Sequence, residues 1–185
     1  PFLNAEEPSP APTASGNIVQ EFWTILTSDT GIPLIEDSQD VSNTDYAVSL
    51  WFKTTNGNCG LFSVTDDRGR SHDRHLYLKG GNLHARVWSN ESISTSGLNL
   101  ADDQWHQVTH TFGGVAGGQK IYIDGVLQAQ GNKTSSQFNW HTKVRIGYSL
   151  GAQTPIFFGK LVGYRMYSHA LTQEDVAQNI SQEYL

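Results

Sequence analysis

Apolar and polar side chains alternate along most of the sequence from residue 18 onward, and glycine-containing turns separate the alternating runs. The clearest run is 46–53 (YAVSLWFK), in which every second position is Tyr, Val, Leu or Phe. A period of two is typical of a β-strand with two distinct faces, because successive side chains point to opposite sides. The same alternation recurs in 76–78, 83–87, 107–112, 120–124, 144–146 and 160–167. The pattern therefore predicts a chain built mainly of strands.

Pairs of turn-forming residues close these runs. They are Asn56-Gly57, Gly80-Gly81, Gly113-Gly114, Gly117-Gly118 and Asp124-Gly125. The last pair lies between IYI and VLQ and indicates a two-residue hairpin, because a type I′ turn needs positive φ at both central positions. Strands at this spacing without helices between them predict an all-β fold, an antiparallel β-sandwich.

One helix is expected, at the C-terminal end of the sequence. Thr172 is a candidate N-cap, and Asp175 occupies the position from which an acidic side chain completes a capping box. Leu171 and Val176 have the spacing of a hydrophobic staple. The sandwich is therefore expected to carry one short C-terminal helix with a structural role.

The length of 185 residues suits one domain of sandwich type. Residues 1–17 contain four of the six prolines and few apolar side chains, which is typical of extended, poorly packed backbone. We expect this segment to be a disordered tail or a linker to other domains of a larger protein. Residues 18–185 are expected to form the folded domain.

Charge excludes several classes of partner. The chain has 12 basic and 18 acidic residues, which gives a net charge of −6, and it has no run of lysine or arginine. A nucleic-acid groove or an anionic membrane surface needs the opposite sign. No run of 18 apolar residues is present, so no membrane insertion is expected. The single cysteine, Cys59, excludes an intrachain disulfide framework.

The order of the strand motifs resembles a known family. In order along the chain they are DYAVSLWFKTT (45–55), LFSVTDD (61–67), LYLKGGNLHARV (77–87), LADDQWHQVTHTF (100–112), KIYIDGVLQAQG (120–131), VRIGYS (144–149) and FFGKLVGYRMYSHALTQEDV (157–176). This series is similar to the laminin-G-like, concanavalin A-like jelly-roll domains, well over 45–176 and weakly over 18–44. The resemblance implies two large antiparallel sheets with ligand sites on the concave face or the rim loops. It also implies an extracellular or cell-surface binding or adhesion module, often calcium-dependent.

Motifs for catalysis are weak. Retaining glycosidases need two carboxylates on one strand face, whereas the acidic neighbours here are adjacent and point to opposite faces. The sequence 147–151 (GYSLG) matches a nucleophile elbow, but that motif requires a helix after the serine and a loop and strand are expected. His106 and His110 lie about 13 Å apart if they occupy one strand, which is too far to share a zinc ion. We therefore expect a binding module and not an enzyme.

The polar segment 65–75 (TDDRGRSHDRH) is the first candidate site. Calcium takes six to eight oxygen ligands, so the carboxylates of Asp66, Asp67 and Asp73 are predicted metal ligands. Arginine binds carboxylate or sulfate through paired hydrogen bonds. The predicted ligand-binding residues of this segment are Arg68, Arg70, His72 and Arg74. The alternative is a solvated loop whose charges compensate one another.

Aromatic residues give the second candidate site. Trp51 and Trp105 belong to strand motifs and are expected in the core. Trp140, with Asn139 beside it, is expected to stack on a sugar ring, and Tyr148 is a weaker companion. Trp88 is the other exposed candidate.

These features together favour a non-catalytic, extracellular module that binds a glycan, with Ca²⁺ as a possible cofactor. Two alternatives stay open. One is a protein–protein adhesion domain, which requires a contiguous apolar patch at the rim. The other is a polysaccharide-acting enzyme such as a lyase, which requires Tyr77, His84 and Arg86 to cluster in one groove.

Overall fold

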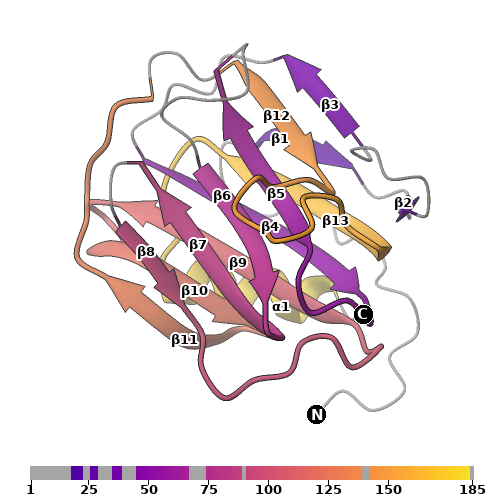
Figure 1. Cartoon of the computed structure of the whole chain (residues 1–185). Coiled ribbons are helices and arrows are strands. Elements are labelled where there is room, and N and C mark those ends of the chain that lie inside the picture. Colours follow the sequence, from indigo (N-terminus) through magenta and orange to yellow (C-terminus); the bar gives the residue numbers. More distant parts are fainter. Residues whose placement is uncertain are drawn as a thin grey trace.

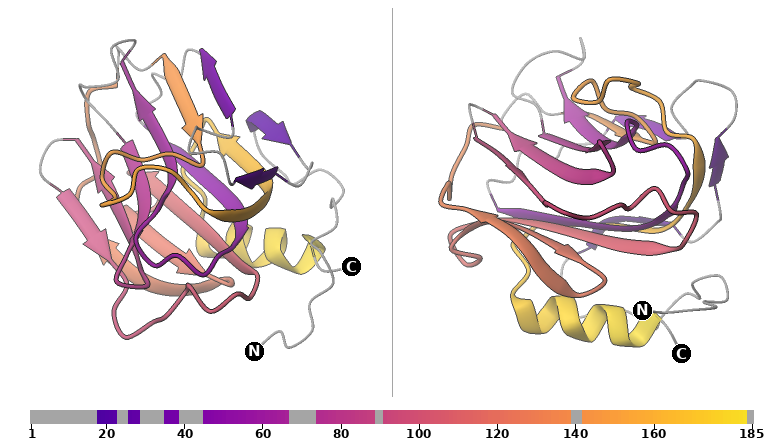
Figure 2. Two further views of the ribbon diagram at one scale, coloured as in Figure 1. Left: turned by 45° about the vertical axis from the view of Figure 1, so that its right-hand side comes forward. Right: turned by 60° about the horizontal axis from the view of Figure 1, so that its bottom comes forward.

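In the part of the chain that the structure describes, two antiparallel sheets pack face to face, with one helix outside them (Figures 1 and 2). The computed structural model describes residues 18–22, 26–28, 35–38, 45–66, 74–88, 91–138 and 142–183. All the runs expected from the alternation lie in strands of the structure, except that Asp124, the last residue of 120–124, lies in a turn. The predicted antiparallel β-sandwich is confirmed. The Pro-rich segment 1–17 lies outside the described residues.

The first sheet has seven strands in the order β1-β13-β4-β9-β10-β11, and β2 pairs with the start of β13. Its strands are β1 (Ile18–Phe22), β2 (Leu26–Ser28), β4 (Tyr46–Lys53), β9 (His106–Gly113), β10 (Gly118–Ile123), β11 (Val126–Gly131) and β13 (Gly159–Tyr167). The strand β13 therefore lies between β1 and β4, next to the edge of this sheet (Figure 1).

The second sheet has six strands in the order β3-β12-β5-β6-β7-β8. Its strands are β3 (Ile35–Ser38), β5 (Gly60–Thr65), β6 (Arg74–Lys79), β7 (Asn82–Val87), β8 (Glu91–Ser94) and β12 (Lys143–Ile146). This is the sheet nearer the viewer in Figure 1. Three of its strands, β3, β5 and β8, and the first two residues of β6 lie outside the alternating runs, although β5 overlaps the family motif at 61–67.

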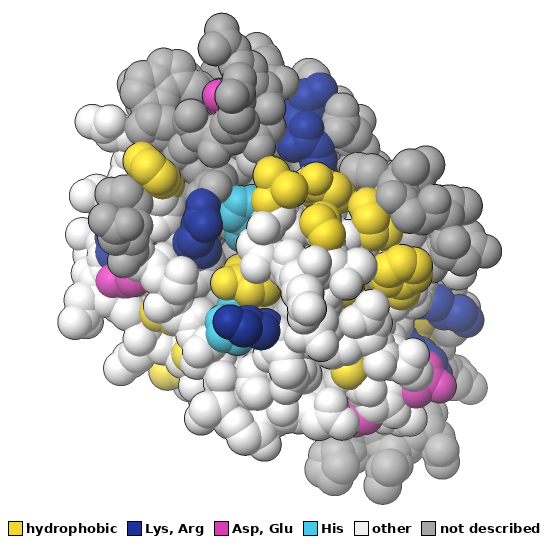
Figure 3. All heavy atoms as spheres, in the orientation of Figure 1, with side chains coloured by type: hydrophobic (Ala, Val, Ile, Leu, Met, Phe, Trp, Pro, Cys, Tyr) yellow, Lys and Arg dark blue, Asp and Glu magenta, His cyan; other side chains and the backbone are white. Residues whose placement is uncertain are grey.

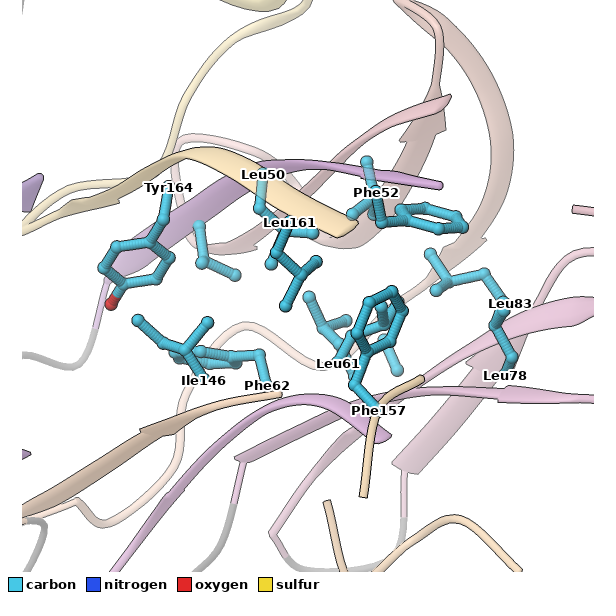
Figure 4. Packing of buried hydrophobic residues seen from close by; sticks show 14 of the residues in the cluster. Leu50, Phe52, Leu61, Phe62, Leu78, Leu83, Ile146, Phe157, Leu161 and Tyr164 are labelled. Carbon is cyan, nitrogen blue, oxygen red and sulfur yellow. The ribbon is translucent and has the colours of Figure 1, made fainter. Parts of the chain in front are cut away.

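The core fills the space between the two sheets (Figure 4). Leu50 and Phe52 of β4 face Phe62 of β5 and Leu83 of β7, and each of these side chains is at most 1% exposed. Burying a side chain of this size stabilises the fold by roughly 1.5–3 kcal/mol, so the alternation of β4 fixes which of its faces points inward. Phe157 enters the same core from the segment between β12 and β13.

The predicted hairpin turn has the expected backbone geometry. Asp124 and Gly125 have φ values of 51° and 78°, and Ile123 pairs directly with Val126. Positive φ at both positions is the signature of a type I′ turn. The carboxylate of Asp124 accepts a hydrogen bond from the backbone N–H of Gln107 at 2.8 Å, so the turn is also tied to β9.

The helix α1 (Gln173–Glu183) begins as expected. The Asp175 carboxylate accepts the Thr172 backbone N–H at 2.8 Å, and the Thr172 hydroxyl accepts the Asp175 N–H at 3.2 Å. This reciprocal pair is a capping box. Leu171 and Val176 are buried with Ala47, so the helix covers part of the outer face of the seven-stranded sheet (Figure 2). Among the described residues, no helix is long and apolar enough to cross a bilayer.

Candidate functional site on the six-stranded sheet

The outer face of the six-stranded sheet is the face turned toward the viewer in Figure 3. Strand pairing decides which side chains it carries, because residues directly opposite each other share a face. Leu76 pairs with Ala85, and both belong to the core. The neighbouring pair Tyr77 and His84 therefore points outward. Figure 3 shows histidine, basic and apolar side chains gathered over β6 and β7.

Tyr77 and His84 form a stacked pair on this face. Their ring centroids are 5.2 Å apart and the rings are inclined by only 14°. The tyrosine ring also lies against Gly151, where an added Cβ would lie 2.5 Å from Cε1 of Tyr77. The ring therefore contacts both the imidazole and the backbone of Gly151. These two contacts restrict the orientation of the ring before any ligand arrives.

Burial and neighbouring charges keep this pair uncharged at neutral pH. Burial lowers the pKa of His84, and the positive charge of Lys79 lowers it further. Burial raises the pKa of Tyr77, and the nearby Arg86 only partly opposes the rise. A neutral imidazole and a protonated phenol can each donate and accept a hydrogen bond. Arg86, two residues after His84 on the same strand face, adds a permanent positive charge.

Basic side chains of β12 also lie on this face, where Arg145 pairs with Glu36 of β3. Arg145 and Lys143 alternate with the buried Val144 and Ile146 of β12. Nη1 of Arg145 donates to the hydroxyl of Thr65 at 2.9 Å, and its guanidinium lies 5.6 Å from the Tyr148 ring centroid. The half-buried Tyr148 thus lies beside a basic group next to the outer face.

The nucleophile-elbow sequence has a structural role in this region. Ser149 is fully buried, and its Oγ lies 2.9 Å from Nδ1 of His75. The backbone N–H of Gly151 donates to the same oxygen at 3.2 Å. A turn and an isolated bridge follow Ser149 in place of a helix, as expected from the sequence. The motif therefore fixes the segment 147–158 against the sheet and lacks the context of a catalytic elbow.

A cavity of about 220 Å³ lies at the end of β7. Trp88, Lys133 and Gln137 line it together with Ser135 and Ser136. Trp88 is 40% exposed, and its backbone carbonyl accepts hydrogen bonds from the Lys133 ammonium and the Ser136 hydroxyl. An exposed indole beside amide, hydroxyl and ammonium groups is a combination that suits a sugar ring.

A chain of buried hydrogen bonds supports this cavity from inside. Nε2 of His110 lies 3.0 Å from the Gln119 Oε1, and the amide nitrogen of Gln119 donates to Glu91 at 2.8 Å. Glu91 in turn accepts the backbone N–H of Lys133 at 3.3 Å. Because Oε1 of Gln119 can only accept, His110 must donate from Nε2, and its Nδ1 then accepts from the Tyr46 hydroxyl at 3.3 Å. The network requires a neutral imidazole.

Because the network needs a neutral His110, we expect the folded protein to be less stable in acid. Burial lowers the pKa of His110 to about 4, the Gln119 bond partly opposes this, and the charge of Arg74 adds to it. As the pH falls from 6.5 to about 4, the unfolded chain binds a proton at this histidine that the folded chain does not. This contribution to stability is therefore complete above pH 6.5 and decreases by up to about 3 kcal/mol as the pH falls.

Urea denaturation of the wild type and His110→Gln across this range tests the expectation. The variant cannot titrate at this position, so its stability should fall less steeply than that of the wild type. Parallel curves for the two proteins would show that His110 is not the group responsible.

Described residues that flank the two segments predicted to bind ligand contact each other near the end of the sandwich that carries the Trp88 cavity. The backbone N–H of Thr142 donates to the carbonyl of Thr65 at 3.2 Å, and the Arg74 guanidinium lies 4.3 Å from the Phe138 ring centroid. These four residues flank the two segments in the chain. The predicted residues Asp67, Arg68, Arg70, His72, Asp73, Asn139 and Trp140 themselves lie outside the described residues. Their roles stay predictions.

Arg74 differs from its expected placement in an exposed loop. It is the first residue of β6 and has no exposed surface. Its guanidinium lies 4.5 Å from the Tyr46 ring centroid and near Phe138, and burial lowers its pKa to about 10. The side chain points inward because Arg74 pairs with Val87 and Val64, whose side chains are also buried. Its contacts are with the core.

Asp66, the one predicted calcium ligand in the described part of the chain, is half-buried at the end of β5. Among the described residues, no three His, Cys, Asp or Glu side chains come together in a way that could hold a metal ion. His106 and His110 occupy one strand, as expected, and His106 contacts the carboxylates of Asp124 and Asp102. Calcium binding stays a prediction.

The positions of the tryptophans and of the basic residues agree only in part with the expectations from the sequence. Trp51 is fully buried, as expected, whereas Trp105 is only half-buried. Sequence reasoning did not single out Lys133, Gln137 or Arg145 as site residues. Arg145 had a usable signal, since the alternation in 143–146 places it opposite to the apolar Val144 and Ile146. Lys133 and Gln137 had none, because they lie in a segment without regular structure.

The domain consists of two jelly-roll sheets. A helix covers part of the outer face of one sheet, and the outer face of the other sheet carries aromatic and basic side chains. This arrangement defines a lectin-like β-sandwich domain. The chain belongs to the concanavalin A-like lectin/glucanases superfamily, whose Laminin_G_3 model matches residues 26–177. The resemblance noted in the strand motifs is therefore confirmed. A search of curated protein sequences finds no match to the chain.

Solved structures share the fold at low sequence identity. Domain 4 of AbnA, an extracellular arabinanase of Geobacillus stearothermophilus in complex with arabinotriose, has a TM-score of 0.65 at 18% identity, covering 90% of this chain and 98% of that one. The CBM40 of the Ruminococcus gnavus IT-sialidase, bound to α2,3 sialyllactose, has a TM-score of 0.61 at 14% identity, covering 80% and 95%. A heptameric SAP-like pentraxin from Limulus polyphemus has a TM-score of 0.58 at 22% identity, covering 92% and 78%.

Proposed function

We propose that this protein is a non-catalytic, extracellular module that binds acidic glycans on the outer face of its six-stranded sheet. The observation that carries the proposal is the stacked Tyr77–His84 pair with Arg86 beside it on the same face. The pair is held rigidly by Gly151, so little conformational entropy is lost when a ligand binds.

The chemistry of the face matches a sugar that carries a negative charge. Arg86 can form paired hydrogen bonds with a carboxylate or sulfate, and these are stronger than bonds between neutral groups. The neutral His84 and the protonated Tyr77 can bond to hydroxyls as donors or acceptors. Trp88 lies two residues beyond Arg86 and lines a cavity suited to a neighbouring sugar ring. A ligand that extends along β7 would contact all four side chains.

The comparisons support this proposal at the level of the fold. The AbnA domain and the sialidase CBM40 are carbohydrate-binding domains of larger proteins, and their structures contain arabinotriose and sialyllactose. The first belongs to an extracellular enzyme. We extend glycan binding, an extracellular location and attachment to other domains to this chain as parts of the proposal.

Calcium is a further part of the proposal. Asp66 lies at the rim from which the segment with Asp67 and Asp73 departs. Carboxylates in a rim segment supply the hard oxygen ligands that this ion prefers. Calcium bound at Asp66 would lie at the end of the sheet where Arg74 pairs with Val64 and Val87, next to Arg86, so its effect should be an increase in glycan affinity.

A glycan array with sialylated, uronic-acid, sulfated and neutral sugars tests the proposal, run once in calcium and once in EDTA. We expect binding to acidic glycans, and at least tenfold weaker binding by Arg86→Met, because a hydrogen bond to a charged group contributes about 1.5–3 kcal/mol. Lys120→Met, which removes a positive charge from β10 of the other sheet, is the matched control. An array without any binding in either condition would overturn the proposal. Equal binding in calcium and EDTA would remove calcium from it.

One observation favours protein adhesion as a second candidate. Figure 3 shows hydrophobic side chains gathered over the segment 147–158, to which Leu150 contributes with 54% of its surface exposed. An adhesion domain requires such a contiguous patch. A blank glycan array together with self-association or capture of one protein ligand that Leu150→Ser abolishes would favour this candidate.

A polysaccharide lyase, the enzyme alternative, would use residues of the proposed glycan site. Tyr77, His84 and Arg86 share one face, as a lyase would require, although neither cavity described for this protein is lined by them. Incubating the protein with polyuronates and measuring the absorbance of unsaturated products distinguishes a lyase from a binding module. We expect no product; turnover that Tyr77→Phe abolishes would make the protein an enzyme.

A further inference from the structure

A second cavity lies where β2, β4 and β13 meet, far from the Trp88 cavity. It has a volume of about 320 Å³, and its walls include Thr27, Lys53, Thr55, Asp103, Phe158 and Lys160. Strand β4 runs from Tyr46, which contacts Arg74 near the Trp88 end, to Lys53 in this cavity, a distance of about 23 Å. Figure 3 shows basic and acidic side chains side by side over this edge of the molecule.

Backbone contacts fix the walls of the cavity. Gly159 has a φ of 138°, and an added Cβ there would lie 2.1 Å from the carbonyl oxygen of Lys53. The hydroxyl of Thr54 donates to the carbonyl of Phe158, and the carbonyl of Thr54 accepts the N–H of Asp103 at 3.1 Å. Asp103 itself has a φ of 63°, which few residues other than glycine adopt. The cavity is therefore preformed.

The charges in the cavity favour an anion. Lys53 and Lys160 are direct partners in the pairing of β4 with β13, so their side chains share a face. Like charges directly opposite each other on a sheet destabilise it. Asp103 lies 3.9 Å from the Lys53 ammonium but is 63% exposed, so solvent screens this ion pair. The charged side chains that line the cavity are thus two ammonium groups and one carboxylate.

The remaining walls favour a ring with hydroxyl groups. Phe158 is 37% exposed, which is unusual for a phenyl ring, and it lies next to the two lysines in the cavity. Thr27 and Thr55 add exposed hydroxyls. A volume near 300 Å³ is at the lower end of the range for small-ligand sites. Such a cavity has room for one or two sugar rings and not for an extended chain.

From these features we infer that the cavity is a second ligand site, which binds a single acidic sugar residue through Lys53 and Lys160 with its ring against Phe158. The carboxylate or sulfate of the sugar lies between the two ammonium groups, and the threonine hydroxyls bond to ring hydroxyls. This inference does not depend on the outer face of the six-stranded sheet, because no side chain is shared between the two sites.

Titration of the whole chain with glucuronate, glucose 6-sulfate, glucose and inorganic sulfate, followed by NMR chemical shifts, tests the inference. We expect the two acidic sugars to shift the resonances of Phe158 and Gly159 at millimolar concentrations, with at least tenfold weaker effects for glucose and for sulfate alone. Sulfate binding as tightly as the acidic sugars would overturn the sugar specificity. No shift with any acidic sugar would overturn the site.

Variants separate this site from the sheet face. Lys53→Met and Lys160→Met should each weaken the glucuronate-dependent shifts of Phe158 and Gly159 at least tenfold, while Lys120→Met should leave these shifts unchanged. Phe158→Ala should weaken the acidic sugars and leave any weak sulfate binding as it is. Melting curves confirm that each variant is folded. An unchanged affinity in folded Lys53→Met and Lys160→Met would refute the assignment even if the glycan array is positive.

Discussion

Replacing Arg74 with alanine is expected to lower the free energy of unfolding by about 3–5 kcal/mol, the range for removing a large buried side chain. The guanidinium fills the space between the rings of Tyr46 and Phe138, at 4.5 and 4.3 Å from their centroids, and nothing of the residue is exposed. The truncation would leave a cavity and remove two cation–π contacts. Chemical denaturation measures the change directly.

Arg74→Met is the matched control for this experiment. Methionine has nearly the length of arginine and no charge, so it can fill the same space without a buried cation. We expect it to destabilise by less than half as much as alanine. If both variants were equally destabilised, the charge and its hydrogen bonds would matter more than the volume. If Arg74→Ala unfolded like the wild type, the side chain would not be buried in solution.

Replacing Gly60 with alanine is expected to destabilise the fold by about 3 kcal/mol, which is the upper part of the range for overpacking. An added Cβ would lie 2.1 Å from the backbone nitrogen of Ser149 and 2.2 Å from the carbonyl oxygen of Pro155. Both neighbours are backbone atoms and cannot rotate away as a side chain can. The segment 147–158 would have to leave the sheet.

Displacement of the segment 147–158 should also change the proposed glycan site, because Gly151 of this segment contacts the Tyr77 ring. Gly60→Ala is therefore expected to weaken glycan binding as well as stability. Gly114→Ala is the control, since no atom lies within 4 Å of its added Cβ. For a domain of this size, 3 kcal/mol corresponds to a fall in Tm of roughly 6–12 °C. A Tm within error of the Gly114→Ala value would contradict the close approach.

The elements that depend on local pattern were predictable from the sequence. The alternation in 46–53 located β4 and its inward face, Asp124-Gly125 located a type I′ hairpin, and Thr172 with Asp175 located the start of α1. In each case the residues that determine the structure are neighbours in the chain. Short edge strands such as β8 carry little alternation and gain their structure from pairing with β7, so they were missed.

The site was less predictable because it depends on contacts between distant residues. Arg74 belongs to a highly charged segment, and its composition indicates exposure. Its burial depends on Tyr46 and Phe138, which are 28 and 64 residues away in the chain, and no local pattern reports this. Tyr77, His84 and Arg86 could be named as a group from the period of two. Their stacking and their support by Gly151 required the structure.

The position of β13 between β1 and β4 has a consequence for synthesis of the chain. A ribosome delivers residues in order, so β4 is complete more than 100 residues before its neighbour β13 (Gly159–Tyr167) emerges. During that time one edge of β4 and the apolar faces of the first strands lack their native neighbours, and such edges favour aggregation. The seven-stranded sheet closes only when the last strand is inserted. Folding of this domain should thus wait for β13 and be slow, as expected for a sandwich dominated by pairings distant in sequence.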